Sequence, residues 1–82
     1  MNKFITYIIK SESIDKLYIG YTANINQRLE KHNSKASKWT ERGVPWKLVY
    51  LKEFDTKHDA IVYEHYLKSL KNRKYLEKII AG

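Results

Sequence analysis

Two short segments near the start of the chain, residues 4–10 and 17–21, are rich in β-branched and aromatic side chains. Both therefore have the composition of β-strands, and the segment between them is polar except for Ile14. This arrangement predicts a β-hairpin. The hairpin constrains the fold strongly, because the pairing of two strands fixes which side chains share a face of the sheet.

The register of the hairpin determines whether two of its tyrosines lie together. If the loop closes between Lys10 and Asp15, Tyr7 lies directly opposite Tyr18 on one face of the sheet. A register shifted by one residue would move Tyr18 to the other face. We therefore expect a Tyr7–Tyr18 pair, provided that the loop has this length.

Two later segments begin with side chains that cap helices. Asn24 precedes a helical pattern that runs to about His32, and Gln27 stands three residues after the cap. Thr56 precedes a longer pattern in the same way, with Asp59 at its third position. The apolar residues that recur at helical spacing in this longer pattern are Ala60, Tyr63, Leu67 and Leu70.

The remaining segments complete a mixed pattern of strands and helices. After Pro45 the sequence WKLVYLKEF predicts a third strand, because proline is tolerated at the beginning of a strand. Asn72 interrupts the long helix, and the apolar residues after it predict a short last helix. With a short helix before Pro45, the predicted order is β-β-α-(α)-β-α-α. Three strands covered by helices can bury this pattern in an α+β, sandwich-like fold.

The composition favours a polyanionic partner. The 82 residues contain 16 Lys and Arg against 9 Asp and Glu, a net charge of +7. Nucleic acid is the first expectation and an anionic membrane the second, although a small basic protein can owe its charge to solubility alone. The chain has no cysteine, which excludes disulfides and thiolate metal sites. No apolar stretch approaches the ~20 residues that span a bilayer, so we expect a cytoplasmic protein without a membrane partner.

Four side chains of the first half could take part in chemistry, and each also has an ordinary structural reading. Tyr7 and Tyr18 are common strand residues, but a phenol close to positive charges can also accept a proton. Arg28 offers a fork of donors to two phosphate oxygens, or it is a solvated helix arginine. His32 could move protons near neutral pH, or it caps a helix end.

Glu64 lies at the edge of the apolar stripe of the long predicted helix. A carboxylate in this place is paired, reaches water or is held for a metal, because a bare buried charge is costly. The simplest reading is a salt bridge to Lys68 one turn later, which stabilises a helix by about 0.2–0.5 kcal/mol. Gly20, at the end of the second strand, either lets a ligand approach the backbone or allows the chain to turn.

The order and spacing of these residues are more specific than any one of them. Thr6-Tyr7-Ile8 is followed by Tyr18-Ile19-Gly20, with the second tyrosine eleven positions after the first, and then by Arg28, His32 and Glu64. This arrangement resembles the GIY-YIG nuclease domain, most of all its small stand-alone bacterial branch, labelled endonuclease-like or excinuclease-like. The resemblance covers nearly the whole chain, which we treat as one domain of residues 1–82. It implies a three-stranded antiparallel sheet flanked by helices.

The resemblance also implies a chemistry, the hydrolysis of a phosphodiester bond with one metal ion. Glu64 would be the ligand of a single Mg²⁺ or Mn²⁺, which stabilises the leaving oxygen. Arg28 would neutralise the charge that grows on the phosphate. Tyr18 would activate the attacking water with Tyr7 as its partner, although the two tyrosines could exchange roles. His32 would assist the phosphate or the proton transfer.

Two positions depart from the family pattern. The first tripeptide is Thr-Tyr-Ile, so its glycine is absent while its tyrosine is kept. Some family members carry a lysine directly after the YIG tripeptide, whereas Tyr21 stands here, which puts that proton-relay contact in doubt. Gly20 itself is present and would let the scissile phosphate approach the backbone.

Further contacts to nucleic acid are expected from the basic segment before the third strand. The candidates are Lys35, Lys38 and Arg42, although a solvated run of charges is an equally ordinary reading. In larger family members separate domains supply target recognition. A unit of this size would therefore bind modestly, through the backbone, and lose affinity steeply with salt. A protein partner could supply substrate specificity.

Three functions are compatible with these features. The first is a metal-dependent endonuclease that acts on DNA, with branched, damaged or single-stranded forms as candidate substrates, in repair or recombination. The second is a nucleic-acid-binding module whose catalysis is weak, partner-dependent or absent. The third is a basic protein-interaction domain without a role in nucleic-acid binding.

Overall fold

The computed structural model describes residues 3–34, 41–70 and 72–82. The strands and helices in chain order are β1 Phe4–Ser11, β2 Leu17–Thr22, α1 Ile25–Asn33, the 3-10 helix η1 Glu41–Gly43, β3 Trp46–Phe54, α2 Lys57–Ser69 and α3 Arg73–Ala81. This order confirms the predicted α+β pattern. Between α1 and β3 the described residues form only the 3-10 turn η1, where a short α-helix was expected. Among the described residues, no helix has both the length and the apolar character needed to cross a bilayer.

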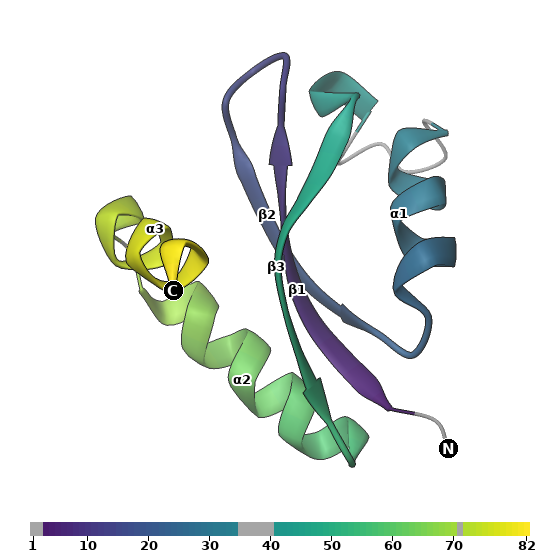
Figure 1. The fold of residues 1–82 in the computed structure, drawn as a ribbon, viewed down its shortest axis with the longest axis vertical. Helices are drawn as coiled ribbons and strands as arrows, with labels where there is room; N and C mark the ends of the chain where they lie inside the picture. Colours follow the sequence, from purple (N-terminus) through teal and green to yellow (C-terminus); the bar gives the residue numbers. More distant parts are fainter. Residues whose placement is uncertain (1–2, 35–40, 71) are drawn as a thin grey trace.

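The three strands form one antiparallel sheet in the order β2-β1-β3 (Figure 1). Strand β1 is therefore central, and β2 is an edge strand whose outer side carries no further strand of the described chain. Helix α1 covers one face of the sheet, while α2 and α3 cover the other. The result is a sandwich of three layers, in which the edge of β2 lies between the two helical layers.

The predicted direct pairing of Tyr7 with Tyr18 is wrong. Tyr7 pairs with Gly20, and Tyr18 pairs with Ile9, because β1 continues to Ser11 and the loop closes between Ser11 and Lys16, one position later than expected. The Ser11 hydroxyl stabilises this loop by accepting hydrogen bonds from the N–H groups of the two residues at positions 13 and 14. Since the register differs by two residues rather than one, both tyrosines still lie on the same face of the sheet.

The alternation of side chains along the strands divides the core into two clusters. On the α1 side, the buried residues Tyr7, Ile9 and Trp46 pack with partly buried residues that include Tyr18 and Leu29. On the other side, Ile8 packs with the buried leucines of the C-terminal helices, Leu67 and Leu76. Thr6 also points to this side, and its hydroxyl donates a hydrogen bond of 2.7 Å to the carbonyl of Ala60 in α2.

The predicted helix caps are confirmed. The Asn24 side chain accepts a hydrogen bond from the N–H of Gln27, and that of Thr56 accepts one from the N–H of Asp59, both at 3.1 Å. Asn72 caps the last helix in the same way. Each cap satisfies an N–H group that the first helical turn leaves without a partner. These caps therefore fix where α1 and α2 begin, and with them the positions of Arg28 and Glu64.

Candidate active site

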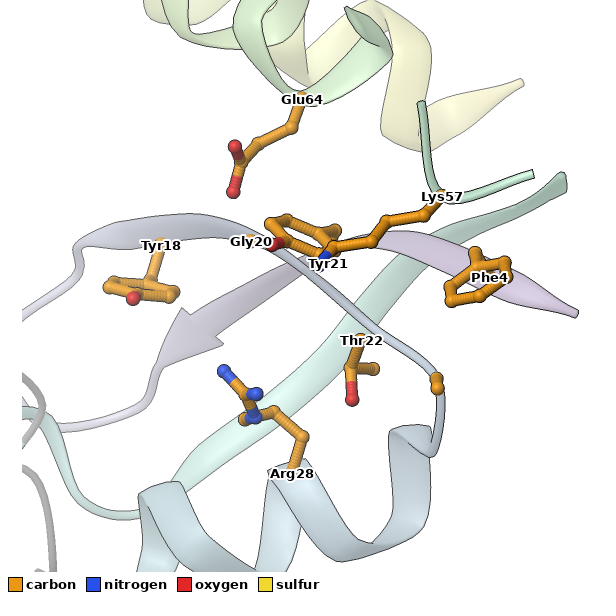
Figure 2. A pocket seen from close by; sticks show the side chains of 9 residues that line it. Phe4, Tyr18, Gly20, Tyr21, Thr22, Arg28, Lys57 and Glu64 are labelled. Carbon is orange, nitrogen blue, oxygen red and sulfur yellow. The ribbon is translucent and has the colours of Figure 1, made fainter. Parts of the chain in front are cut away.

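A pocket of about 330 Å³ lies over the edge of β2 (Figure 2). Four of the residues that the sequence indicated for chemistry or ligand approach line it, namely Tyr18, Gly20, Arg28 and Glu64. The other lining residues are Phe4, Tyr21, Thr22, Ala23 and Lys57. The pocket thus brings together side chains from the hairpin, from α1 and from α2.

Glu64 and Arg28 reach this pocket from opposite faces of the sheet. Glu64 extends from α2 toward Gly20, and Arg28 extends toward the same strand from α1 (Figure 2). They can meet because β2 is an edge strand, so that no neighbouring strand separates the two faces at this place. A ligand in the pocket would contact the edge of β2 with a guanidinium on one side and a carboxylate on the other.

Gly20 lines the pocket, and the packing of the core also requires a glycine at this position. It pairs with Tyr7, whose ring lies against it on the α1 side of the sheet. A Cβ atom at position 20 would lie 2.6 Å from Tyr7 Oη and 2.8 Å from Tyr7 Cζ. No side chain can occupy this position unless the Tyr7 ring moves.

Tyr7 and His32 form a buried pair and are not among the residues that line the pocket. Tyr7 Oη and His32 Nε2 are 2.9 Å apart, and the two residues are 0% and 3% exposed. Burial raises the pKa of Tyr7 to about 12, helped by the nearby Tyr18 and opposed by the charge of Arg28. Burial, followed by the charges of Arg28 and Lys31, lowers the pKa of His32 below its ordinary 6.5. Both groups are therefore uncharged at neutral pH.

Tyr18 packs between this pair and Trp46. Its ring makes edge contacts with His32 and with Trp46, with ring centroids 4.9 and 6.3 Å away. The main chain of Trp46 is held by Asn33, the last residue of α1. The Asn33 Oδ1 atom accepts a hydrogen bond of 2.6 Å from the Trp46 N–H, and Nδ2 donates one of 3.0 Å to the Trp46 carbonyl.

The sequence interpretation missed this support by Asn33 and Trp46. Asn33 directly follows His32 and terminates the predicted helix, where an asparagine usually caps or turns the chain. Nothing in its position indicates a partner thirteen residues later. The contact therefore depends on how α1 docks on the sheet.

Glu64 is buried, with only 8% of the residue exposed. Its Oε2 atom is 3.5 Å from the ammonium of Lys68, so the simple ion pair expected one turn later is present. Oε1 lies 3.9 Å from Nε2 of His65. The carboxylate also lines the pocket, so the ion pair does not remove it from the site.

The single carboxylate of Glu64 suits a Mg²⁺ or Mn²⁺ ion that is bound weakly and takes further ligands from the substrate. In the part of the chain that the structure describes, no group of three or more His, Cys, Asp or Glu could hold a metal ion. Mg²⁺ commonly binds through one or two carboxylates together with waters and substrate phosphate oxygens, rather than in a cage of protein ligands. One carboxylate that faces an open pocket fits this mode of binding.

Arg42, one of the expected basic contacts before β3, is not among the residues that line the pocket. Arg42 lies exposed in η1, where its carbonyl accepts a hydrogen bond of 3.1 Å from the Ser13 hydroxyl. Lys35 and Lys38 lie outside the described residues. The pocket instead contains Lys57, a cation that the sequence interpretation missed. The spacing between Lys57 and Glu64 could have indicated it. Lys57 precedes Glu64 by seven residues, and residues seven apart lie on the same side of a helix.

Comparisons with known proteins agree with the fold. A family model described as the GIY-YIG catalytic domain matches residues 3–76. A UPF0213 protein of Staphylococcus saprophyticus is 37% identical over the full length of both chains. The UPF0213 protein YsiG of Lactococcus lactis is 41% identical over 100% of this chain and 79% of its own. The solution NMR structure of a UPF0213 protein from Bacillus halodurans is similar with a TM-score of 0.57 and 32% identity, covering 96% of this chain and 83% of that one.

Proposed function

The chain belongs to the GIY-YIG catalytic domain family, a nuclease-like family, and on this premise we propose that it is a metal-dependent endonuclease that hydrolyses phosphodiester bonds in DNA. One observation supports this proposal above all others. Tyr18 and Arg28 on one side of β2 and Glu64 on the other line a single pocket. A phosphodiester in this pocket would meet a cation, a phenol and a carboxylate at once.

Arg28 is the residue proposed to bind the scissile phosphate. Among the described residues, no carboxylate lies within ion-pair distance of its guanidinium, although it lines the pocket. A guanidinium stays charged at every working pH and presents two parallel donors to two phosphate oxygens. Its charge would stabilise the additional negative charge of the transition state.

Tyr18 is the residue proposed to accept a proton from the attacking water. Tyr18 lines the pocket, whereas Tyr7 lies behind Gly20 and is fully buried. The raised pKa of Tyr7 also opposes its ionisation. We therefore assign Tyr7 and His32 to positioning, because their hydrogen bond holds the layer of aromatic rings against which Tyr18 packs.

Glu64 is the proposed ligand of one Mg²⁺ or Mn²⁺. When bound, such an ion stabilises negative charge on the leaving oxygen and orients the phosphate. Glu64 contributes a hard oxygen donor at a fixed place, because α2 is anchored to the sheet beneath it and Lys68 holds the carboxylate from outside the pocket. The net charge of +7 would attract the polyanionic substrate to the site where this metal ion is weakly bound.

We further propose that the substrates are branched, damaged or single-stranded DNA met in repair or recombination in the cytoplasm. The pocket is short and open at the edge of a small sheet, so the domain offers few contacts for reading base sequence. A protein partner would then supply target specificity. The UPF0213 names of the relatives state no substrate.

A cleavage assay tests the proposal. Supercoiled plasmid, a four-way junction and a single-stranded oligonucleotide are incubated with the protein in Mg²⁺, Mn²⁺ or EDTA. We expect cleavage that EDTA abolishes and that Glu64→Gln lowers at least a hundredfold. Glu53→Gln is the matched control, because it makes the same change at an exposed glutamate of β3 that does not line the pocket.

Cleavage that is equal in the wild type and in Glu64→Gln would be contamination. If binding to DNA persisted in that case, the chain would be a nucleic-acid-binding module without catalysis. If the protein bound neither DNA nor RNA at any salt concentration, a protein-interaction domain would replace both readings.

A further inference from the structure

A second cation, Lys57, lines the pocket. It is the first residue of α2, and Figure 2 draws its side chain extending toward Tyr21. Lys57 precedes Glu64 by seven residues, so the two Cα atoms are about 10 Å apart along the helix axis at ~1.5 Å per residue. The pocket therefore contains a second positive charge, on a side chain that starts about two helical turns away from Glu64.

The described residues leave this charge without an acidic partner. No carboxylate among them lies within ion-pair distance of Lys57, and the same holds for Arg28. The one carboxylate in the pocket, that of Glu64, is already paired with Lys68. Two cations thus face the pocket from the two sides of β2, a charge pattern that suits an anion longer than a single phosphate group.

The position of Lys57 is not explained by the stability of the helix. Cations are favourable near the C-terminus of a helix and unfavourable in its first turn, because the N-terminus carries a partial positive charge. Lys57 stands in that first turn and is exposed to solvent. This position does not favour the helix, but it suits a lysine that contacts a ligand in the pocket.

We propose that Lys57 binds the phosphate next to the scissile one, so that the substrate strand crosses the edge of β2 from Arg28 toward the beginning of α2. This inference rests on the proposed nuclease function and adds the path of the strand. The compact ammonium of a lysine suits a phosphate that only has to be held, whereas the fork of Arg28 suits the reacting one. Phe4 and Tyr21 also line the pocket, and their rings can support a sugar or base of the strand.

Binding measured without cleavage tests this assignment. Fluorescence anisotropy of a labelled single-stranded DNA oligonucleotide is recorded with the Glu64→Gln protein over a series of KCl concentrations. Adding Lys57→Ala should weaken binding several-fold and reduce the slope of log K against log salt by about 0.7, the value for one lost contact to a single strand. Lys57→Arg should keep the slope. Lys74→Ala is the control, because Lys74 is an exposed lysine of α3 that does not line the pocket.

Kinetics of the cleaving protein separate the two proposals. If the wild type cleaves DNA, Lys57→Ala should raise KM while leaving kcat within about twofold, as expected when an interaction is lost equally from substrate and transition state. An unchanged salt slope, or one changed as much by Lys74→Ala, would overturn the role of Lys57 while leaving the nuclease proposal intact. If the wild type cleaved nothing, the nuclease proposal would fail, and the salt slope would still decide whether Lys57 contacts the strand. Circular dichroism melting verifies that each variant is folded.

Discussion

The phenol of Tyr7 fills the space in which a side chain of Gly20 would lie. The two residues pair across β1 and β2, and a Cβ atom at Gly20 would come within 2.6 Å of Tyr7 Oη. Because the glycine leaves this room, the Tyr7 ring can lie against β2 and reach His32 with its hydroxyl. The same absence of a side chain exposes the backbone of β2 to the pocket, so one glycine serves both the core and the site.

Gly20→Ala should therefore destabilise the protein. The new methyl group would displace the Tyr7 ring from a fully packed position, and overpacking of this kind costs about 1–3 kcal/mol. For a domain of this size each kcal/mol lowers Tm by about 4–8 °C. Thermal unfolding followed by circular dichroism measures the effect.

A double-mutant cycle attributes this cost to Tyr7. In a Tyr7→Leu background the alanine at position 20 should cost much less, because the atoms that it meets are gone. An equal cost in both backgrounds would show that the strain arises elsewhere on β2.

Tyr7 and Tyr18 should respond differently when the hydroxyl of each is removed. Tyr18→Phe should lower kcat by about 10²–10⁴, the usual contribution of a positioned proton acceptor. Tyr7→Phe should act mainly on stability, by about 0.5–1.5 kcal/mol, because it removes the hydrogen bond to His32 and keeps the ring. Parallel measurements of kcat and of urea unfolding compare the two variants. The assignment of roles would be reversed if Tyr7→Phe caused the larger loss in kcat.

Stability should fall as the pH is lowered from 7 to 5. Burial lowers the pKa of His32 in the folded protein below its ordinary 6.5, so in this range the unfolded chain binds a proton that the folded chain does not. By linkage, the free energy of unfolding then decreases as pH falls. The carboxyls of Asp15 and Asp55, whose pKa values are lowered by Arg73 and Lys3, lose their contribution only at more acidic pH.

Urea unfolding at pH 7 and pH 5 measures this dependence. His32→Gln should reduce the difference between the two pH values, whatever its effect on stability at pH 7. His58→Gln, which changes an exposed histidine of α2, should leave the difference as in the wild type. If the difference between pH 7 and pH 5 persisted in His32→Gln, it would arise from a group other than His32.

Asn33→Ala should destabilise the protein more than other asparagine substitutions on α1. The Asn33 side chain bonds both the N–H and the carbonyl of Trp46, and the partly buried main-chain groups would lose these partners. The expected cost is about 1–3 kcal/mol. Asn26→Ala, an exposed position on the same helix, provides the control in the same unfolding experiment. Equal effects of the two substitutions would show that the hydrogen bonds from Asn33 to Trp46 contribute little to stability.

Much of the fold follows from local patterns in the sequence. The strands and helices were predictable because alternation with a period of two and capping by Asn24 and Thr56 act over a few residues. The resemblance to the GIY-YIG family, carried by the order of its tyrosines, Arg28 and Glu64, is confirmed by the family model and by the relatives. It was also predictable that Tyr7 and Tyr18 lie on the same face of the sheet, because this depends only on whether the register is shifted by an odd or an even number of residues.

The tertiary structure decided what the pocket contains. The position of the hairpin loop along the chain depends on hydrogen bonds of Ser11, and this position places Gly20 rather than Tyr18 opposite Tyr7. The docking of α1 and α2 on opposite faces of the sheet determines that Arg28, Glu64 and the unforeseen Lys57 meet at the edge of β2. Sequence periodicity reports which face of its own element a residue occupies, but contacts between distant elements depend on packing and register, which no local pattern encodes.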